Sequence, residues 1–369
     1  MGDDPARPTM AGTGSRCIAI VGPYLSGKTT LLEALMARTE AVPRQGKIAD
    51  GNTLGDASPE ARKHQMSVEL NVASTSYLGD TFTFVDIPGS IEFQHEGATA
   101  LQVCDAAIVV CEPDPKRVPA LQLTLKRLEE LGVPHFLFLN KIDTFNTPVR
   151  DIIPVLQPAS ARPLVLRQIP IWENGIATGY VDLAADRAHV YREHAASEIV
   201  EIPEDVSERR DDARYQMLEQ LADYDDDLME QLLADMEPPR DMVFDDLAQE
   251  LRDGVICPVM LGAAEKGNGI GRLLKALRHE VAGIQATAER VGVSDDGNAQ
   301  AYVIKTIHTP HAGKVSVVRV LTGALQDGAA VSTDDKEDKV SGVFDLTGAD
   351  MSKRGKAQTG DVVGLGRLE

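Results

Sequence analysis

The sequence predicts an α/β protein in which a parallel sheet carries an inserted α+β subdomain and is followed by a small antiparallel β-barrel domain. Continuous apolar runs of strand length alternate with helical stretches at 16–22, 81–89, 105–113, 135–143 and 255–264. Such runs indicate strands whose two faces are both covered by helices. From residue 299 onward, short β runs separated by Gly and Asp turns are typical of a small barrel instead.

The same patterns predict the limits of the domains. We expect an α/β domain over 15–284, with the insert at about 155–250, because periodicity loosens there before the last apolar strand. A linker over 285–298 and a barrel over 299–369 follow. Residues 1–14 are acidic and rich in Gly and Pro, without an apolar signal core, so we expect a disordered leader.

The insert contains an acidic amphipathic stretch whose leucines follow helical spacing: Leu218, Leu221, Leu228 and Leu232. Four aspartates lie among them: Asp223, Asp225, Asp226 and Asp227. Acidic runs of this kind usually stay in water, so we interpret them as a solvated helix face and not as a metal site.

Composition excludes several classes of function. The 369 residues carry a net charge of −20, which argues against direct DNA binding and against an anionic membrane surface. No apolar run approaches the roughly 20 residues that cross a bilayer. The four cysteines lack zinc-ligand spacing, and three lie in or beside apolar runs, which indicates buried free thiols in a cytoplasmic protein. We expect a monomer.

A glycine-rich loop between the first strand and the first helix predicts a phosphate site. The segment "GPYLSGKTT" has the order G-x-x-x-x-G-K-[ST], in which backbone N–H groups surround a polyphosphate. Lys28 is expected to reach the β- and γ-phosphate oxygens, and the Thr29 hydroxyl to ligate Mg²⁺. The residues assigned to the nucleotide are Gly22, Pro23, Tyr24, Leu25, Ser26, Gly27, Lys28, Thr29 and Thr30.

The next apolar strand ends in "DIPGS", which predicts the end of the site that meets the terminal phosphate. Asp86 is placed for a magnesium contact made through water or from the second coordination shell, and Gly89 can turn its N–H toward the γ-phosphate. Upstream, Ser67 is the hydroxyl placed as a third magnesium ligand; an exposed strand-edge serine is the alternative.

The segment "NKID" predicts which base is bound. The Asp143 carboxylate can accept hydrogen bonds from the two N–H donors on the Watson–Crick edge of guanine, which adenine does not offer. Asn140 is expected to brace the surrounding loops, and the Lys141 stem to lie across the base. In "GAAEKG", Ala263 and Ala264 are expected at the base, with the Ala264 N–H toward guanine O6. The predicted ligand is GTP or GDP with Mg²⁺.

At this point the sequence resembles elongation factor G and its relatives among the translational GTPases. Residues 43–70 resemble the switch I region of that family, 167–191 with 218–233 the insert that marks elongation factor G, and 301–331 its second-domain β-barrel. The resemblance implies a P-loop GTPase fold, GTP hydrolysis coupled to the ribosome, and translocation as the nearest biological role. It also implies further domains after the barrel, so we expect either part of a longer protein or a shortened paralogue.

Four positions depart from the family pattern. Leu25 stands where the P-loop usually has Asp, Ser67 where switch I has Thr, and Ala263 where the guanine loop has Ser. The fourth is Ser90, which matches the histidine that orients the attacking water. His95 lies five residues further on, and we do not expect it to replace that histidine. The catalytic positions are therefore Gly89 and Ser90, and we expect hydrolysis to be slow.

Three alternatives stay open. The first is a GTP-gated module that binds the ribosome with weak or no hydrolysis, which Ser90 favours. The second is a GTPase of the release-factor or ribosomal-protection type. The third is a P-loop kinase or ATPase, against which "NKID" argues.

Overall fold

The chain is described here from a computed structural model. It describes residues 14–55, 61, 63, 67–90, 94–144, 148–309, 313–333, 336–348 and 350–366. The predicted leader lies outside these residues except for Gly14. Within the described part of the chain, no helix combines the length and the apolar character needed to cross a bilayer.

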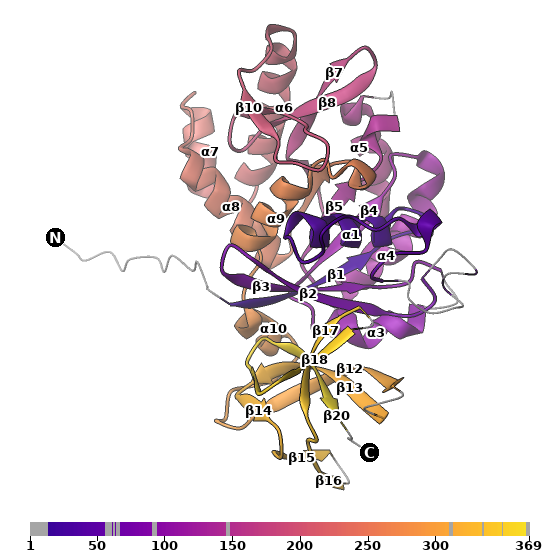
Figure 1. The fold of residues 1–369 in the computed structure, drawn as a ribbon. Helices are drawn as coiled ribbons and strands as arrows, with labels where there is room; N and C mark the ends of the chain where they lie inside the picture. The colour runs from indigo at the N-terminus through magenta and orange to yellow at the C-terminus, as the bar shows by residue number, and fades with distance from the viewer. Residues whose placement is uncertain are drawn as a thin grey trace, which may run out of the picture.

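The predicted α/β fold with a following antiparallel β domain is confirmed (Figure 1). Parallel strands lie in the order β3-β1-β4-β5-β11-β6, and β2 pairs antiparallel with β3. The strands of this sheet are β1 (Ser15–Val21), β2 (Asn71–Tyr77), β3 (Asp80–Asp86), β4 (Ala106–Cys111), β5 (His135–Leu139), β6 (Leu164–Leu166) and β11 (Cys257–Leu261).

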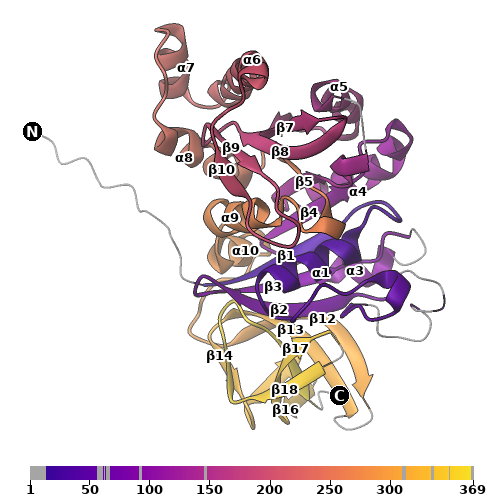
Figure 2. The same ribbon diagram turned by 45° about the horizontal axis from the view of Figure 1, so that its top comes forward.

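Helices cover both faces of the sheet (Figure 2). Successive β1 side chains alternate between two cores: Cys17, Ala19 and Val21 belong to one, and Ile18 and Ile20 to the other. The helices are α1 (Lys28–Arg38), α3 (Gln94–Gln102), α4 (Val118–Glu130), α5 (Val149–Leu156), α9 (Ile270–Glu280) and α10 (Ile284–Arg290). Short 3₁₀ turns are η1 (Ile48–Asp50), η3 (Pro115–Arg117), η4 (Ile142–Thr144), η5 (Gln157–Ala159) and η6 (Ala264–Lys266).

The segment expected as the insert forms a four-stranded antiparallel sheet and three helices. They are β7 (Gln168–Glu173), β8 (Ile176–Asp182), β9 (Arg187–Val190), β10 (Glu198–Val200), α6 (Glu204–Ala222), α7 (Asp226–Leu233) and α8 (Arg240–Asp253). Leu218, Leu221 and Leu228 are buried, as their spacing predicts. Strand β6 lies in the same stretch of sequence but pairs with β11 at the edge of the main sheet.

The C-terminal strands form the β domain below the main sheet in Figure 1. They are β12 (Gln300–Thr309), β13 (Gly313–Thr322), β14 (Ala324–Gln326), β15 (Ala330–Thr333), β16 (Lys336–Lys339), β17 (Val343–Thr347), β18 (Asp350–Arg354), β19 (Lys356–Gln358) and β20 (Val362–Gly366). Thr347 of β17 bridges Ala73 of β2, so the two domains share one hydrogen-bonded path of strands. Helix α10 occupies the stretch expected as a linker.

One buried carboxylate joins the α/β domain to the β domain. Asp105, directly before β4, accepts a hydrogen bond from Cys17 N at 2.7 Å and another from the Thr287 hydroxyl of α10 at 2.6 Å. It also meets Arg319 Nη2 of β13 at 2.8 Å, with both side chains fully buried. Among the described residues, Nε and Nη1 of Arg319 have no hydrogen-bond partner, so Asp105 holds this guanidinium through Nη2, while the charge of Asp361 also favours the cation.

We therefore expect Asp105→Asn to lower the free energy of unfolding by about 3 kcal/mol, because it removes one partner of a buried ion pair and disturbs the hydrogen bonds to Cys17 and Thr287. Urea unfolding of the whole chain measures this. Glu130→Gln, in an exposed pair with Lys126, is the matched control and should cost less than about 1 kcal/mol. Equal costs for the two variants would contradict the role of Asp105.

A second buried carboxylate, Glu250 of α8, lies among acidic neighbours. It is 4% exposed, and neither carboxylate oxygen has a hydrogen-bond partner among the described residues. Burial, together with the charges of Asp246, Asp225, Asp253 and Asp223, raises the pKa of Glu250 to about 9. The folded chain therefore keeps this proton at neutral pH.

We expect the stability of the folded chain to fall as pH rises from about 6 to about 8, because the unfolded chain then binds fewer protons than the folded chain. The unfolded chain releases the Glu250 proton near the ordinary pKa of 4.5. The slope is at most about 1.4 kcal/mol per pH unit for one proton. Glu250→Gln should flatten the curve in urea unfolding across this range, whereas the control Glu230→Gln should not. Parallel curves for parent and Glu250→Gln would disprove this.

Candidate nucleotide site

The loop 22–27 connects β1 to α1 and needs glycine at both ends. Gly22 has φ +139°, and a Cβ there would lie 2.2 Å from the Val110 carbonyl oxygen. Gly27 has φ +95°, and a Cβ there would lie 2.4 Å from Asn140 Nδ2. Left-handed backbone and close approach together exclude larger residues. The loop therefore delivers its backbone to the N-terminus of α1, where anions bind favourably.

Lys28 lies over this loop. Its buried ammonium donates to the carbonyl oxygens of Gly22 at 3.2 Å and Pro23 at 3.0 Å. Pro23 and Ser26 are buried or nearly so at the base of the loop. Tyr24 and Leu25 are 41% and 54% exposed. The tip of the loop thus faces solvent, whereas the Lys28 ammonium is buried. Thr30, in the first turn of α1, is half-buried.

The three predicted magnesium ligands are linked through the Thr29 hydroxyl. The Thr29 hydroxyl donates to Asp86 Oδ2 at 2.8 Å and lies 3.0 Å from the Ser67 hydroxyl. Asp86 is fully buried and Thr29 is 6% exposed. These residues come from α1, from the end of β3 and from the segment before β2, so only the folded chain brings them together.

Gly89 lies directly against the phosphate loop. A Cβ at Gly89 would lie 2.2 Å from Lys28 Nζ and 2.7 Å from the Gly22 carbonyl oxygen. Ser90 follows it and is half-buried. Residues 91–93 and the side chain of His95 lie outside the described part of the chain. The backbone after Asp86 therefore lies next to the Lys28 ammonium and the backbone of the phosphate loop.

On the opposite side of the loop, Asn140 connects three segments. It follows β5, is 2% exposed, and donates from Nδ2 to the Ser26 carbonyl oxygen at 2.9 Å. Its Oδ1 accepts the Ala264 N–H at 2.9 Å. Asn140 thus ties the phosphate loop to the loop containing Ala263 and Ala264. The Ala264 N–H predicted to meet guanine O6 is thus donated to Asn140 in this structure, and its assignment to the base stays a prediction.

Asp143 lies in η4, next to the same loop. Its Oδ2 forms an ion pair with Lys266 Nζ at 2.8 Å, and this hydrogen bond raises the pKa of Lys266. Lys141 donates from Nζ to the Leu25 carbonyl oxygen at 3.1 Å and also pairs with Glu112. Lys266 lies within the "GAAEKG" motif, but no sequence pattern indicated that it would contact Asp143.

Sequence reasoning also missed Glu33 of α1. This buried side chain accepts the Gly46 N–H at 3.2 Å and the Leu54 N–H at 2.5 Å. It therefore holds the backbone at Gly46 and Leu54 against α1. Glu33 lies within an apolar helix face, where only the burial of a charged residue could have drawn attention to it.

The residues fit a magnesium–polyphosphate ligand. Two hydroxyls and one carboxylate form a set of hard oxygen donors, and Mg²⁺ in proteins is usually held by one or two carboxylates together with phosphate oxygens and water. Thr29, Ser67 and Asp86 would hold the metal, while Lys28 and the N–H groups of the loop would hold the phosphates. Bound there, the metal would neutralise charge on the phosphates.

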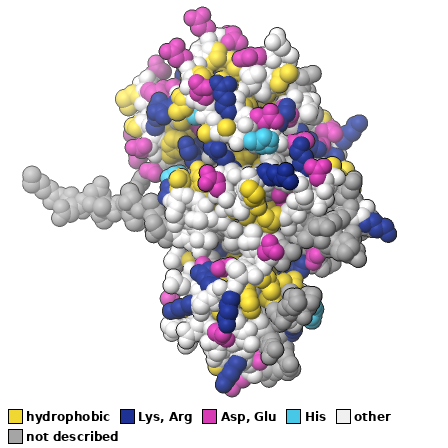
Figure 3. Space-filling view, viewed as in Figure 1, with side chains coloured by type: hydrophobic (Ala, Val, Ile, Leu, Met, Phe, Trp, Pro, Cys, Tyr) yellow, Lys and Arg dark blue, Asp and Glu magenta, His cyan; other side chains and the backbone are white. Residues whose placement is uncertain are grey.

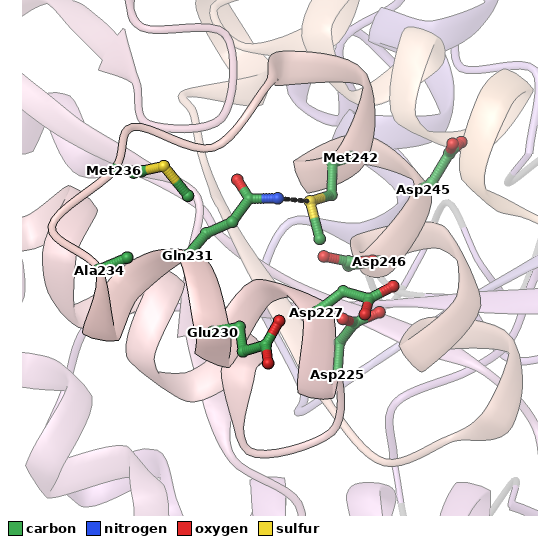
Figure 4. Close-up of a pocket in the computed structure, with 9 residues that line it drawn as sticks. All are labelled: Asp225, Asp227, Glu230, Gln231, Ala234, Met236, Met242, Asp245 and Asp246. Atoms are coloured by element: carbon green, nitrogen blue, oxygen red, sulfur yellow. Dashed lines mark hydrogen bonds between the residues drawn. The ribbon is translucent and has the colours of Figure 1, made fainter.

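A separate acidic hollow of about 660 Å³ lies between α7 and α8 (Figure 4). Asp225 caps α7 there by accepting the Leu228 N–H at 2.8 Å, and Gln231 Nε2 lies 3.2 Å from Met242 Sδ. Acidic side chains also gather over the insert in Figure 3. In the sequence, the residues that line the hollow are far from the phosphate loop. The hydrogen bond by which Asp225 caps α7 accounts for the position of this carboxylate.

Fold and site together define a P-loop nucleotide-binding domain joined to a β domain. The family model of the elongation factor Tu GTP binding domain matches residues 13–282, and that of elongation factor G domain 2 matches residues 298–369. The chain therefore belongs to the elongation factor G-like group of translational GTPases, which confirms the resemblance seen in the sequence.

Individual relatives agree with this assignment. The elongation factor G-like protein of Synechocystis sp. is 40% identical over 356 residues, which cover 96% of this chain and 52% of the relative. Elongation factor G of Chlamydia trachomatis serovar D is 26% identical over 371 residues, which cover 94% of this chain and 53% of the relative. A crystal structure of a protein from Thermus thermophilus matches with a TM-score of 0.87 and 27% identity, covering 97% and 53%. The chain thus spans about half the length of the relatives it matches.

Proposed function

We propose that this chain binds GTP and GDP with Mg²⁺ and hydrolyses GTP to GDP and phosphate in connection with the ribosome, during translation elongation. The observation that carries the proposal is the meeting of Thr29, Ser67 and Asp86 beside the phosphate loop. The chain would work in the cytoplasm as a monomer, with the ribosome as its partner.

The protein's own groups would act mainly by positioning and by electrostatics, as is general in phosphoryl transfer. Lys28 and the N–H groups at the start of α1 would offset the phosphate charge. Gly89, held against the loop, would direct its N–H toward the terminal phosphate. Ser67, attached to the segment before β2, would connect the metal site to a part of the chain that a partner can sense.

A second candidate is a GTP-gated ribosome-binding module with weak or no hydrolysis. Ser90 favours it, because a serine hydroxyl is a poor group for orienting and activating water beside Gly89. Binding requires Lys28, Thr29 and Asp86, and does not depend on the residue at 90. The two candidates therefore share one site and differ in the chemistry at a single position.

Guanine specificity is tested by Asp143→Asn. We expect the affinity for GDP to fall by about 100-fold or more, because the amide cannot accept both guanine N–H bonds. Affinity for xanthosine diphosphate should rise, since that base offers an oxygen where guanine has its amino group. Titration calorimetry of the parent and variant with both nucleotides measures this. Unchanged GDP affinity would remove Asp143 from the site.

Hydrolysis is tested by single-turnover reactions of the parent and a Ser90→His variant, with and without ribosomes. Without a water-orienting group we expect the parent alone to turn over on the order of 10⁻⁴ s⁻¹. A faster Ser90→His variant, with unchanged GTP affinity, would assign the slow step to position 90. Ser90→Ala is the matched control. Full-length elongation factor G serves as the positive control that the ribosomes can stimulate hydrolysis. Ribosome-stimulated turnover of the parent would favour the enzyme over the gated module.

A further inference from the structure

A lysine of the β domain contacts the segment that follows Ser67. Lys305 of β12 donates from Nζ to Glu69 Oε2 at 2.6 Å and to the Leu70 carbonyl oxygen at 3.0 Å. Its side chain is 13% exposed, and that of Glu69 is 44% exposed. The lysine therefore makes a largely buried contact with the backbone of another domain, beyond a surface ion pair alone.

The contacted segment begins at a predicted magnesium ligand. We call residues 67–70 the switch segment. Its first residue, Ser67, lies 3.0 Å from the Thr29 hydroxyl. Just after its end, Asn71 is the register partner of Asp86 across β2 and β3. The switch segment is thus held at one end by the metal-site hydroxyls and at the other by the strand that carries the metal-site carboxylate.

A second part of the β domain supports the same region. Gly348, in the turn after β17, donates its N–H to the Val72 carbonyl oxygen at 2.9 Å. A Cβ at Gly348 would lie 2.4 Å from the Leu54 carbonyl oxygen, so the turn also packs against the chain held by Glu33. The β domain therefore contacts the chain on both sides of Ser67.

We propose that Lys305 is a positioning residue for Ser67, through which the β domain strengthens binding of the nucleotide that carries a terminal phosphate. This inference rests on the proposed function. Lys305 acts at a distance from the phosphates, through the backbone. Its two hydrogen bonds fix the chain two and three residues after Ser67, and so restrict where that hydroxyl can lie.

The contact affects GTP more than GDP for a thermodynamic reason. A ligand gains from an interaction only to the extent that its bound state requires the conformation which the interaction favours. In GTPases, the γ-phosphate and its metal order such switch segments, whereas bound GDP does not require an ordered switch segment. The Lys305 contact favours the ordered position of Ser67. It therefore strengthens the binding of GTP and leaves the binding of GDP nearly unchanged.

The test compares Lys305→Met with the parent in the full chain, using fluorescent GDP and a fluorescent non-hydrolysable GTP analogue with Mg²⁺. Methionine keeps the apolar stem and removes the charge. We expect affinity for the GTP analogue to fall about tenfold, as for loss of hydrogen bonds from a charged group, and affinity for GDP to change less than about twofold. Lys353→Met is the control: this barrel lysine is 70% exposed and pairs with Asp327.

A second variant tests the pair itself. Glu69→Gln should lower the affinity for the GTP analogue less than Lys305→Met does, because the hydrogen bond from Lys305 to the Leu70 carbonyl oxygen remains. In the double variant the two losses of affinity should not add, since both substitutions remove the same ion pair between Lys305 and Glu69. Thermal unfolding of each variant is measured alongside.

The outcomes separate the inference from the proposed function. If the parent binds neither guanine nucleotide, the proposed function falls and this inference falls with it. If the parent binds both and Lys305→Met keeps the parental ratio of affinities, the inference alone is overturned. An equal loss for both nucleotides with lowered thermal stability also overturns it, because Lys305 would then only hold the domains together.

Discussion

The parallel pairing of β1 with β3 decides where the site forms. Ile20 and Asp86 are register partners, so the strand that leads into the phosphate loop ends beside the strand that carries the carboxylate. Parallel strands also end at the same edge of a sheet, which is where ligands bind in open α/β folds. Given this register, Thr29 at the start of α1 can reach Asp86, and the remaining contacts of the metal site follow.

Around that edge, short polar contacts hold the loops that the sheet alone would leave free. Asn140 links the phosphate loop to the loop of Ala264, and Lys141 reaches the Leu25 carbonyl oxygen. Where such groups are buried, as Asn140 is, an unmade hydrogen bond is costly. The site is therefore a set of mutually dependent loops.

The second domain belongs to this arrangement physically as well as by sequence. Asp105 and Arg319 form a buried ion pair across the junction, and β17 continues the strand path from β2. A buried pair of this kind stabilises little on its own but penalises separation, because either charge alone would remain desolvated. The β domain is consequently held where Lys305 can contact the chain next to Ser67.

Much of this protein was determined by its sequence alone. Apolar strand runs predicted the fold, the phosphate-loop spacing named Thr29, and the strand ending in "DIPGS" named Asp86, because local patterns of hydrophobicity and glycine reflect local backbone requirements. Ser67 was named only as the nearby hydroxyl upstream of that strand. The sequence did not reveal that Lys266 pairs with Asp143, that Glu33 holds the backbone at Gly46 and Leu54, or that Lys305 contacts Glu69 across 236 residues. Long, charged side chains of this kind carry no spacing signal. Only the packing of the domains decided which of them would meet.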